Sequence, residues 1–100
     1  MSEYDQRQYK LLKSRIVQFR EGQIGLPRLI SDLDALLCAL QSADEAWKSS
    51  FQENWGLLEE VYATALDRGK QELGPEDRKL VDQAVEKMSE LLEAVWPQSD

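Results

Sequence analysis

Histidine is absent from this 100-residue sequence, and cysteine occurs once, at Cys38. Histidine is the commonest general base and the commonest zinc ligand in proteins, and its charge changes most readily near neutral pH. A single cysteine excludes an internal disulfide and a cysteine-cluster metal site. The composition therefore argues against an enzyme, and we expect no catalytic residues, no bound metal and no cofactor.

Long apolar runs and alternating apolar patterns are missing as well. The longest unbroken apolar run, Ala35 to Leu40, has six residues, whereas a membrane helix needs about 20. The first five residues carry acids where a signal peptide carries bases, and no apolar segment of signal-peptide type follows. No segment alternates with period two, so no strand is predicted. We expect a cytoplasmic, all-α protein that has no contact with a membrane.

Four amphipathic segments account for most of the chain. Their apolar spacing and their glycine and proline boundaries predict helices over about residues 3–21, 27–41, 43–68 and 75–96. Gly22 and Gly69 are placed to end the first and third helices, and Pro27 and Pro75 are placed to begin the second and fourth. Because short links favour antiparallel neighbours, we predict that residues 1–100 form a single domain, a four-helix up-down bundle.

The third helix is the longest of the four and holds two of the three tryptophans. Ser42 and Glu45 fit a capping box, in which the serine side chain accepts from the Glu45 N–H and the glutamate reaches back to the Ser42 N–H. The large apolar residues of the helix fall within an arc of about 100°: Trp47, Phe51, Leu58, Val61, Tyr62 and Ala65. We therefore expect the other helices to pack on this one.

Negative charge dominates the sequence and is unevenly distributed. The net charge is −7, yet the first 21 residues hold five basic and three acidic residues. From Gly22 onward, seven basic residues stand against sixteen acidic ones, which gives that part a net charge of −9. Such a surface repels nucleic-acid phosphates and attracts basic proteins. We therefore expect a basic protein partner and no nucleic acid.

The outer face of the third helix carries acids at a spacing of seven, with a glycine between them: Glu53, Gly56, Glu60 and Asp67. A glycine inside a helix costs about 1 kcal/mol relative to alanine. One explanation for Gly56 is that another chain approaches closely there; the alternatives are chance, a slight bend, or packing against the first helix. Trp55 lies at the edge of the apolar stripe, where it serves either the core or an interface, since tryptophan is enriched among interface hot spots.

The fourth helix carries a denser acidic stripe, within an arc of about 80° opposite its apolar face: Asp82, Glu86, Glu90 and Glu93. Like charges four residues apart cost a few tenths of a kcal/mol each in an isolated helix. The stripe either docks on a basic surface, where it would speed the encounter of the two proteins, or is a solvated face that keeps the domain soluble.

A small, acidic, helical protein with no active-site motif resembles a bacterial immunity protein or antitoxin. The run from Trp47 to Ala63 is also similar to segments of small proteins encoded beside contact-dependent or polymorphic toxins. The resemblance implies tight binding to a basic toxin, typically a nuclease domain, without any catalysis by this chain. The predicted partner-binding residues are Glu53, Trp55, Gly56, Glu60, Asp67, Asp82, Glu86, Glu90 and Glu93.

A second hypothesis is a structural or adaptor module that self-associates. Ser31, Ala35 and Ala39 surround Cys38 on a side of the second helix away from its leucines. Small residues allow another helix to approach closely, either from the same chain or from a second copy. Without a histidine to activate it, Cys38 is expected to be a structural or semi-buried thiol. The protein is accordingly a monomer or a homodimer, with Trp55 as a further contact in the latter.

Overall fold

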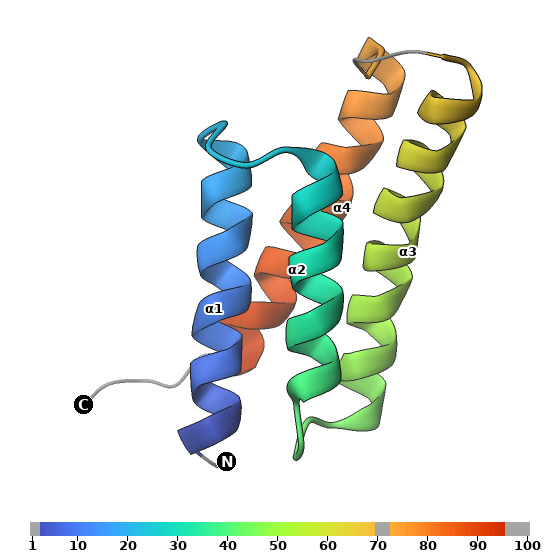
Figure 1. Cartoon of the computed structure of the whole chain (residues 1–100). Coiled ribbons are helices and arrows are strands. Elements are labelled where there is room, and N and C mark those ends of the chain that lie inside the picture. The colour runs from blue at the N-terminus through green and yellow to red at the C-terminus, as the bar shows by residue number, and fades with distance from the viewer. Residues whose placement is uncertain (1–2, 70–72, 96–100) are drawn as a thin grey trace.

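Four helices run alternately up and down in the computed structural model, which describes residues 3–69 and 73–95 (Figure 1). They are α1 (Glu3–Arg20), α2 (Leu26–Ala39), α3 (Glu45–Asp67) and α4 (Pro75–Val95). These two ranges contain no strand. The predicted all-α, up-down four-helix architecture is thereby confirmed.

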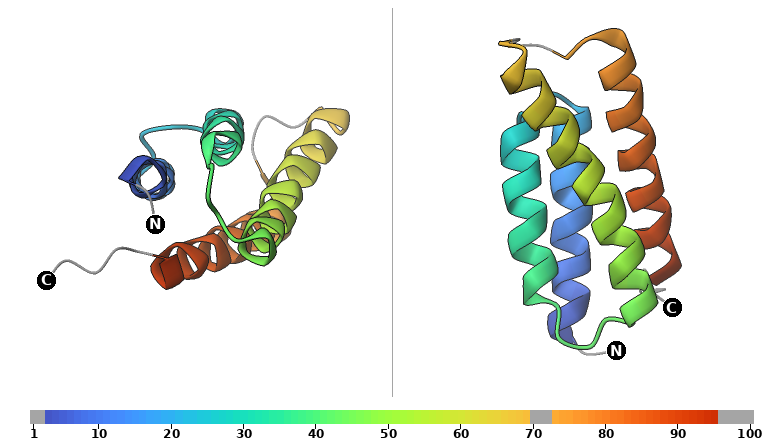
Figure 2. Two further views of the ribbon diagram at one scale, coloured as in Figure 1. Left: turned by 90° about the horizontal axis from the view of Figure 1, so that it is seen from below. Right: turned by 90° about the vertical axis from the view of Figure 1, so that its right-hand side faces the viewer.

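The helices form two hairpins that pack as two layers. α1 and α2 make one layer, and α3 and α4 make the other, inclined to the first (Figure 2). Each helix packs on the next one along the chain, and α1 also packs on α4. This arrangement leaves an outer face on every helix, and the outer faces of α3 and α4 are those that carry the predicted acidic rows.

The core lies between the two layers and draws on all four helices. Its fully buried members come from the apolar faces of the helices and include Tyr9, Leu12, Ile16, Leu29, Leu33, Phe51, Leu58, Val81, Val85, Met88 and Leu92. Side chains of this kind contribute about 1.5–3 kcal/mol each when they are removed from water. Hydrophobic burial therefore supplies the main stabilisation of the bundle.

Trp47 joins three of the helices. Its ring stacks on Phe51 and meets Tyr9 edge to face, with centroids 5.2 Å apart in both pairs. Its indole N–H donates a hydrogen bond of 2.7 Å to the Leu91 carbonyl oxygen on α4. The polar atom of the indole is thus satisfied inside the protein, as a buried tryptophan requires. Trp47 is a core residue. The expectation that the other helices pack on α3 is correct for α2 and α4 but wrong for α1, which packs on α2 and α4 and meets α3 at the Trp47–Tyr9 ring contact.

The connection between α2 and α3 differs from the prediction. α2 ends at Ala39 and α3 begins at Glu45, two residues inside each predicted boundary. Asp44 is the N-cap of α3, and its carboxylate accepts a hydrogen bond of 3.2 Å from the Trp47 N–H. The predicted capping box of Ser42 and Glu45 is therefore wrong. The end of α4 predicted at residue 96 lies outside the described residues.

Asp5 explains why the capping box does not form. Its carboxylate is fully buried and accepts hydrogen bonds from the backbone N–H groups of Gln41, at 3.0 Å, and Ser42, at 2.6 Å. A buried carboxylate is very costly unless hydrogen bonds compensate it, and bonds to a charged group contribute about 1.5–3 kcal/mol each. Asp5 thus fastens the start of α1 to the α2–α3 connection, 36 residues away.

Replacing this carboxylate should destabilise the fold. In Asp5→Asn the amide group can accept only on its oxygen, so one of the two backbone donors loses its partner. We expect the free energy of unfolding, measured by urea denaturation, to fall by about 2–3 kcal/mol. The matched control is Asp34→Asn at an exposed position of α2, which should change it by less than about 0.5 kcal/mol. Equal stability of the two variants would contradict the structural role of Asp5.

Tyr9 makes the stability sensitive to alkaline pH. Burial, and secondarily the negative charge of Asp5, raise the pKa of the Tyr9 hydroxyl above its ordinary value of 10.0. The unfolded chain therefore loses this proton at a lower pH than the folded protein does, and unfolding is favoured as the pH rises. We expect the free energy of unfolding to fall above pH ~10, and to fall less steeply in Tyr9→Phe. Identical pH profiles for the two proteins would exclude this contribution.

Candidate protein-binding surface

All seven carboxylates predicted from the sequence are exposed, and we call them the acidic faces: Glu53, Glu60 and Asp67 on α3, and Asp82, Glu86, Glu90 and Glu93 on α4. α3 and α4 are antiparallel neighbours, so the two rows run along adjacent helices (Figure 1). From Glu53 to Asp67 the α3 row extends over about 21 Å at 1.5 Å per residue.

Ion pairs within the described residues do not neutralise the carboxylates of the acidic faces. The ion pairs within the described residues join Asp32 to Arg15, at 3.3 Å, and to Arg28, at 3.6 Å. No member of the acidic faces forms an ion pair with a described lysine or arginine, including Lys79 and Lys87 on α4 itself. Negative charge that is neither buried nor paired is available to a positively charged partner.

A groove of about 480 Å³ lies between α3 and α4. Leu57 and Ala84 give it an apolar floor, and Asn54 lines it from α3. Glu86 and Glu90 line it from α4, together with Gln83 and Lys87. An apolar centre within a polar rim is the usual anatomy of a protein interface. Two of the seven carboxylates, Glu86 and Glu90, therefore lie at the rim of a concave surface.

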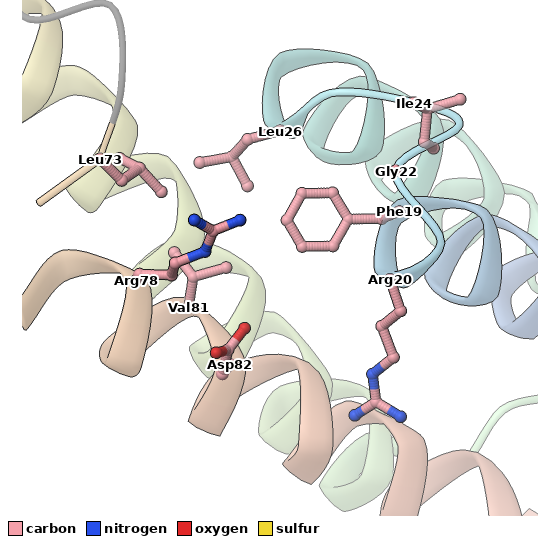
Figure 3. Close-up of a pocket in the computed structure, with 9 residues that line it drawn as sticks. All are labelled: Phe19, Arg20, Gly22, Ile24, Leu26, Leu73, Arg78, Val81 and Asp82. Atoms are coloured by element: carbon pink, nitrogen blue, oxygen red, sulfur yellow. The ribbon is translucent and has the colours of Figure 1, made fainter. Parts of the chain in front are cut away.

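The seven carboxylates do not converge on one spot. Asp82 lines a different cleft, where α4 faces the end of α1 and where Arg20 and Arg78 are its charged neighbours (Figure 3). Asp67 is the last residue of α3. The acidic faces are thus an extended surface rather than a compact cluster. Such a surface suits contact with a macromolecule better than it suits a reaction at one substrate atom.

Gly56 is half exposed, and nothing within the bundle explains it. A Cβ built on this residue would have no heavy atom within 4 Å outside its own stretch of helix. Packing of Gly56 against α1, one of the explanations considered, is therefore wrong. Chance, a slight bend and the close approach of another chain remain as explanations, and the open space is what a close approach would need.

Trp55 is half-buried and connects α3 to α2. Its indole N–H donates a hydrogen bond of 2.8 Å to the Ile30 carbonyl oxygen. The polar edge of the ring is therefore occupied inside the protein, and Trp55 positions the two hairpins against each other. That Trp55 takes part in an interface stays a prediction. A partner could contact only the exposed part of the ring, because the N–H is already bonded to Ile30.

Cys38 is exposed, so the expectation of a semi-buried thiol is wrong. Its Sγ lies 3.9 Å from the Asp34 carboxylate one turn earlier. Ser31 and Ala35 are exposed as well, and no helix of residues 3–69 or 73–95 covers them. The small-residue side of α2 therefore does not receive a helix from the described part of the same chain, and contact with a second copy stays untested.

The described residues contain neither a cluster of metal-ligating side chains nor a membrane-spanning helix. Within the described ranges, no three acidic or cysteine side chains come together in a way that could hold a metal ion. None of the four helices combines the length and the apolar character that crossing a bilayer requires.

Comparison with models of protein families, with curated proteins and with solved structures finds no match for this chain. Its function must therefore be inferred from its own residues, chiefly from the acidic faces and from the groove between α3 and α4.

Alanine at position 56 should stabilise the free protein. Gly56→Ala adds a methyl group in open space and removes the flexibility of a mid-helix glycine, which is worth about 0.5–1 kcal/mol. Thermal and urea unfolding measure the gain. Gly74→Ala serves as the contrast, because Gly74 precedes α4 and its carbonyl oxygen accepts from the Arg78 N–H, an N-cap position at which alanine should not stabilise the protein. A destabilised Gly56→Ala would mean that α3 needs this glycine for its own geometry.

Proposed function

We propose that this protein is a non-catalytic binding protein of the cytoplasm that neutralises a basic toxin domain, in the manner of a bacterial immunity protein. The observation that carries the proposal is the set of seven exposed carboxylates without an ion-pair partner in the described part of the chain. A nuclease domain, whose active site binds phosphates, presents the complementary positive surface. The acidic faces would occupy that surface in place of the nucleic acid.

Charge accounts for how fast the two proteins meet. With a net charge of −7, the chain attracts a basic partner over distances up to about the Debye length, which is roughly 10 Å at 0.1 M salt. Steering of this kind raises association rates from about 10⁵–10⁶ to as much as about 10⁸–10⁹ M⁻¹s⁻¹ at low salt. Exposed rim carboxylates thus mainly set the on-rate and the choice of partner.

The groove accounts for how long they stay together. A lysine or arginine of the partner can lay its aliphatic stem on Leu57 and Ala84 while its charged head meets Glu86 and Glu90. Asn54 bonds to the Ser50 carbonyl oxygen through its Nδ2, at 2.9 Å, so its Oδ1 can still accept from the partner. Contacts that exclude water at such a centre dominate affinity. Inhibition by coverage needs no catalytic group on this chain.

The direct test is binding to the product of the adjacent gene, which the proposal predicts to contain a basic toxin domain, with inhibition of that toxin as a second readout. The double variant Glu86→Gln/Glu90→Gln should weaken binding about tenfold or more at low salt, because both negative charges at the groove are lost. The matched control, Glu3→Gln/Glu59→Gln, removes the same charge from exposed positions outside the acidic faces and should weaken it less than about threefold.

Salt provides the second arm of this test. The association rate of the unaltered protein should fall steeply between low and high salt, and the groove variant should show a shallower dependence. An association rate that does not depend on salt, or equal losses in the groove variant and its control, would contradict binding through the acidic faces.

The self-association hypothesis is tested with the same material. Sedimentation of the isolated protein should show a monomer at the concentrations used for toxin binding. A stable dimer that Ala35→Glu dissociates would favour the adaptor hypothesis instead, because Ala35 is exposed on α2, away from the acidic faces.

A further inference from the structure

The end of the bundle that holds the C-terminus of α1 and the N-terminus of α2 lies opposite the end that holds Asp5 (Figure 1). A hollow is found there. It consists of one cleft of about 470 Å³ between α1 and α4 and another of about 530 Å³ between α2 and α3. Leu26 and Leu73 line both clefts, so the two adjoin as lobes of a single feature, which we call the end cleft. Each lobe falls within the range of about 300–1,000 Å³ typical of small-molecule sites.

The first lobe carries positive charge within an acidic protein. Arg20 and Arg78 stand on opposite walls, and the Arg78 guanidinium is directed among Phe19 and Leu26 (Figure 3). Neither arginine forms an ion pair in the described part of the chain, and among the described lining residues Asp82 is the only acid. The lobe is therefore net positive, and its apolar walls strengthen the attraction of a guanidinium for an anion.

The described residues that line the second lobe are mostly apolar and carry no charge. Apart from glycines and the two shared leucines, Pro27, Tyr62, Ala65 and Leu66 line it, and none of these is charged. Leu66 is 57% exposed, the largest value among the large hydrophobic side chains that the structure describes. An apolar group placed in this lobe would remove Leu66 from water, which is favourable in proportion to the area covered.

We propose that the end cleft binds a small amphipathic carboxylate. The anionic head lies at the Arg78 guanidinium, and the hydrocarbon tail passes over Leu26 and Leu73 into the lobe of Tyr62 and Leu66. A carboxylate matches the planar donors of a guanidinium in a bidentate manner. The charge of the first lobe and the apolar lining of the second are both needed for such a ligand, and each lobe can be tested separately.

Decanoate, kept below its micelle concentration, is the probe, and calorimetry and NMR shift changes measure its binding. We expect one molecule per chain and about tenfold tighter binding than for decanol, which has the tail without the charge. Arg78→Gln should abolish the preference for decanoate and leave decanol binding unchanged. Leu66→Ser should weaken both ligands alike. Arg78 and Leu66 are exposed, so neither change removes a core side chain.

Matched controls keep the result specific. Arg7→Gln removes an exposed arginine far from the end cleft, and Leu80→Ser removes a large side chain that is 40% exposed and does not line it. Both should bind decanoate as the unaltered protein does. The groove variant Glu86→Gln/Glu90→Gln should do so as well, which separates this site from the proposed toxin-binding surface.

Three outcomes would overturn the proposal. The first is the absence of saturable decanoate binding. The second is equal binding of decanoate and decanol by the unaltered protein. The third is binding that neither Arg78→Gln nor Leu66→Ser weakens, since decanoate would then lie elsewhere. An acidic amphipathic peptide that shifts the end-cleft resonances where decanoate does not would assign the cleft to a protein segment and would likewise overturn it.

Discussion

The contact of the Asp5 carboxylate with the backbone of Gln41 and Ser42 fixes how the two hairpins meet. It is a charge placed at 0% exposure, tolerated because two N–H groups compensate it. It brings the start of α1 to the connection between the hairpins, next to the Trp47 ring that joins α1, α3 and α4. The bundle is therefore closed at this end by polar and aromatic contacts together, whereas the opposite end retains a cleft.

The acidic residues of the chain divide into those that the fold uses and those that it leaves free. Asp5 and Asp44 accept backbone hydrogen bonds, and Asp32 pairs with two arginines. The seven carboxylates of the acidic faces make no such contact among the described residues. Their mutual repulsion lowers stability slightly, and no ion pair among the described residues offsets it. The proposed role in recognition would give these charges a function that folding does not.

Local spacing was sufficient to predict the helices and their exposed acids. Apolar residues recurring with the helical period place Glu53 or Glu86 on an outer face as surely as they place Phe51 or Met88 in the core. Gly56 likewise lies on the outer face where the spacing puts it. These features depend on residues within one or two turns of each other, so a single helix contains the information.

Features that depend on distant residues could not be predicted in this way. Asp5 has the sequence context of an ordinary acid in a first helical turn, and its partners are 36 and 37 residues away. Ser42 was wrongly predicted as an N-cap because its contact with the distant Asp5 is not visible in the local sequence. The α3–α4 groove and the end cleft also combine side chains from separate helices, as does the bond from Trp55 to Ile30. Only the packed structure brings these residues together.

The most direct test of the acidic faces as a binding surface is a structure of the complex with the toxin domain. The account predicts lysine or arginine nitrogens of the partner within about 4 Å of the Glu86 and Glu90 carboxylates, with an aliphatic stem over Leu57. A partner seated on α1 and α2, with the α3–α4 groove left in solvent, would contradict it.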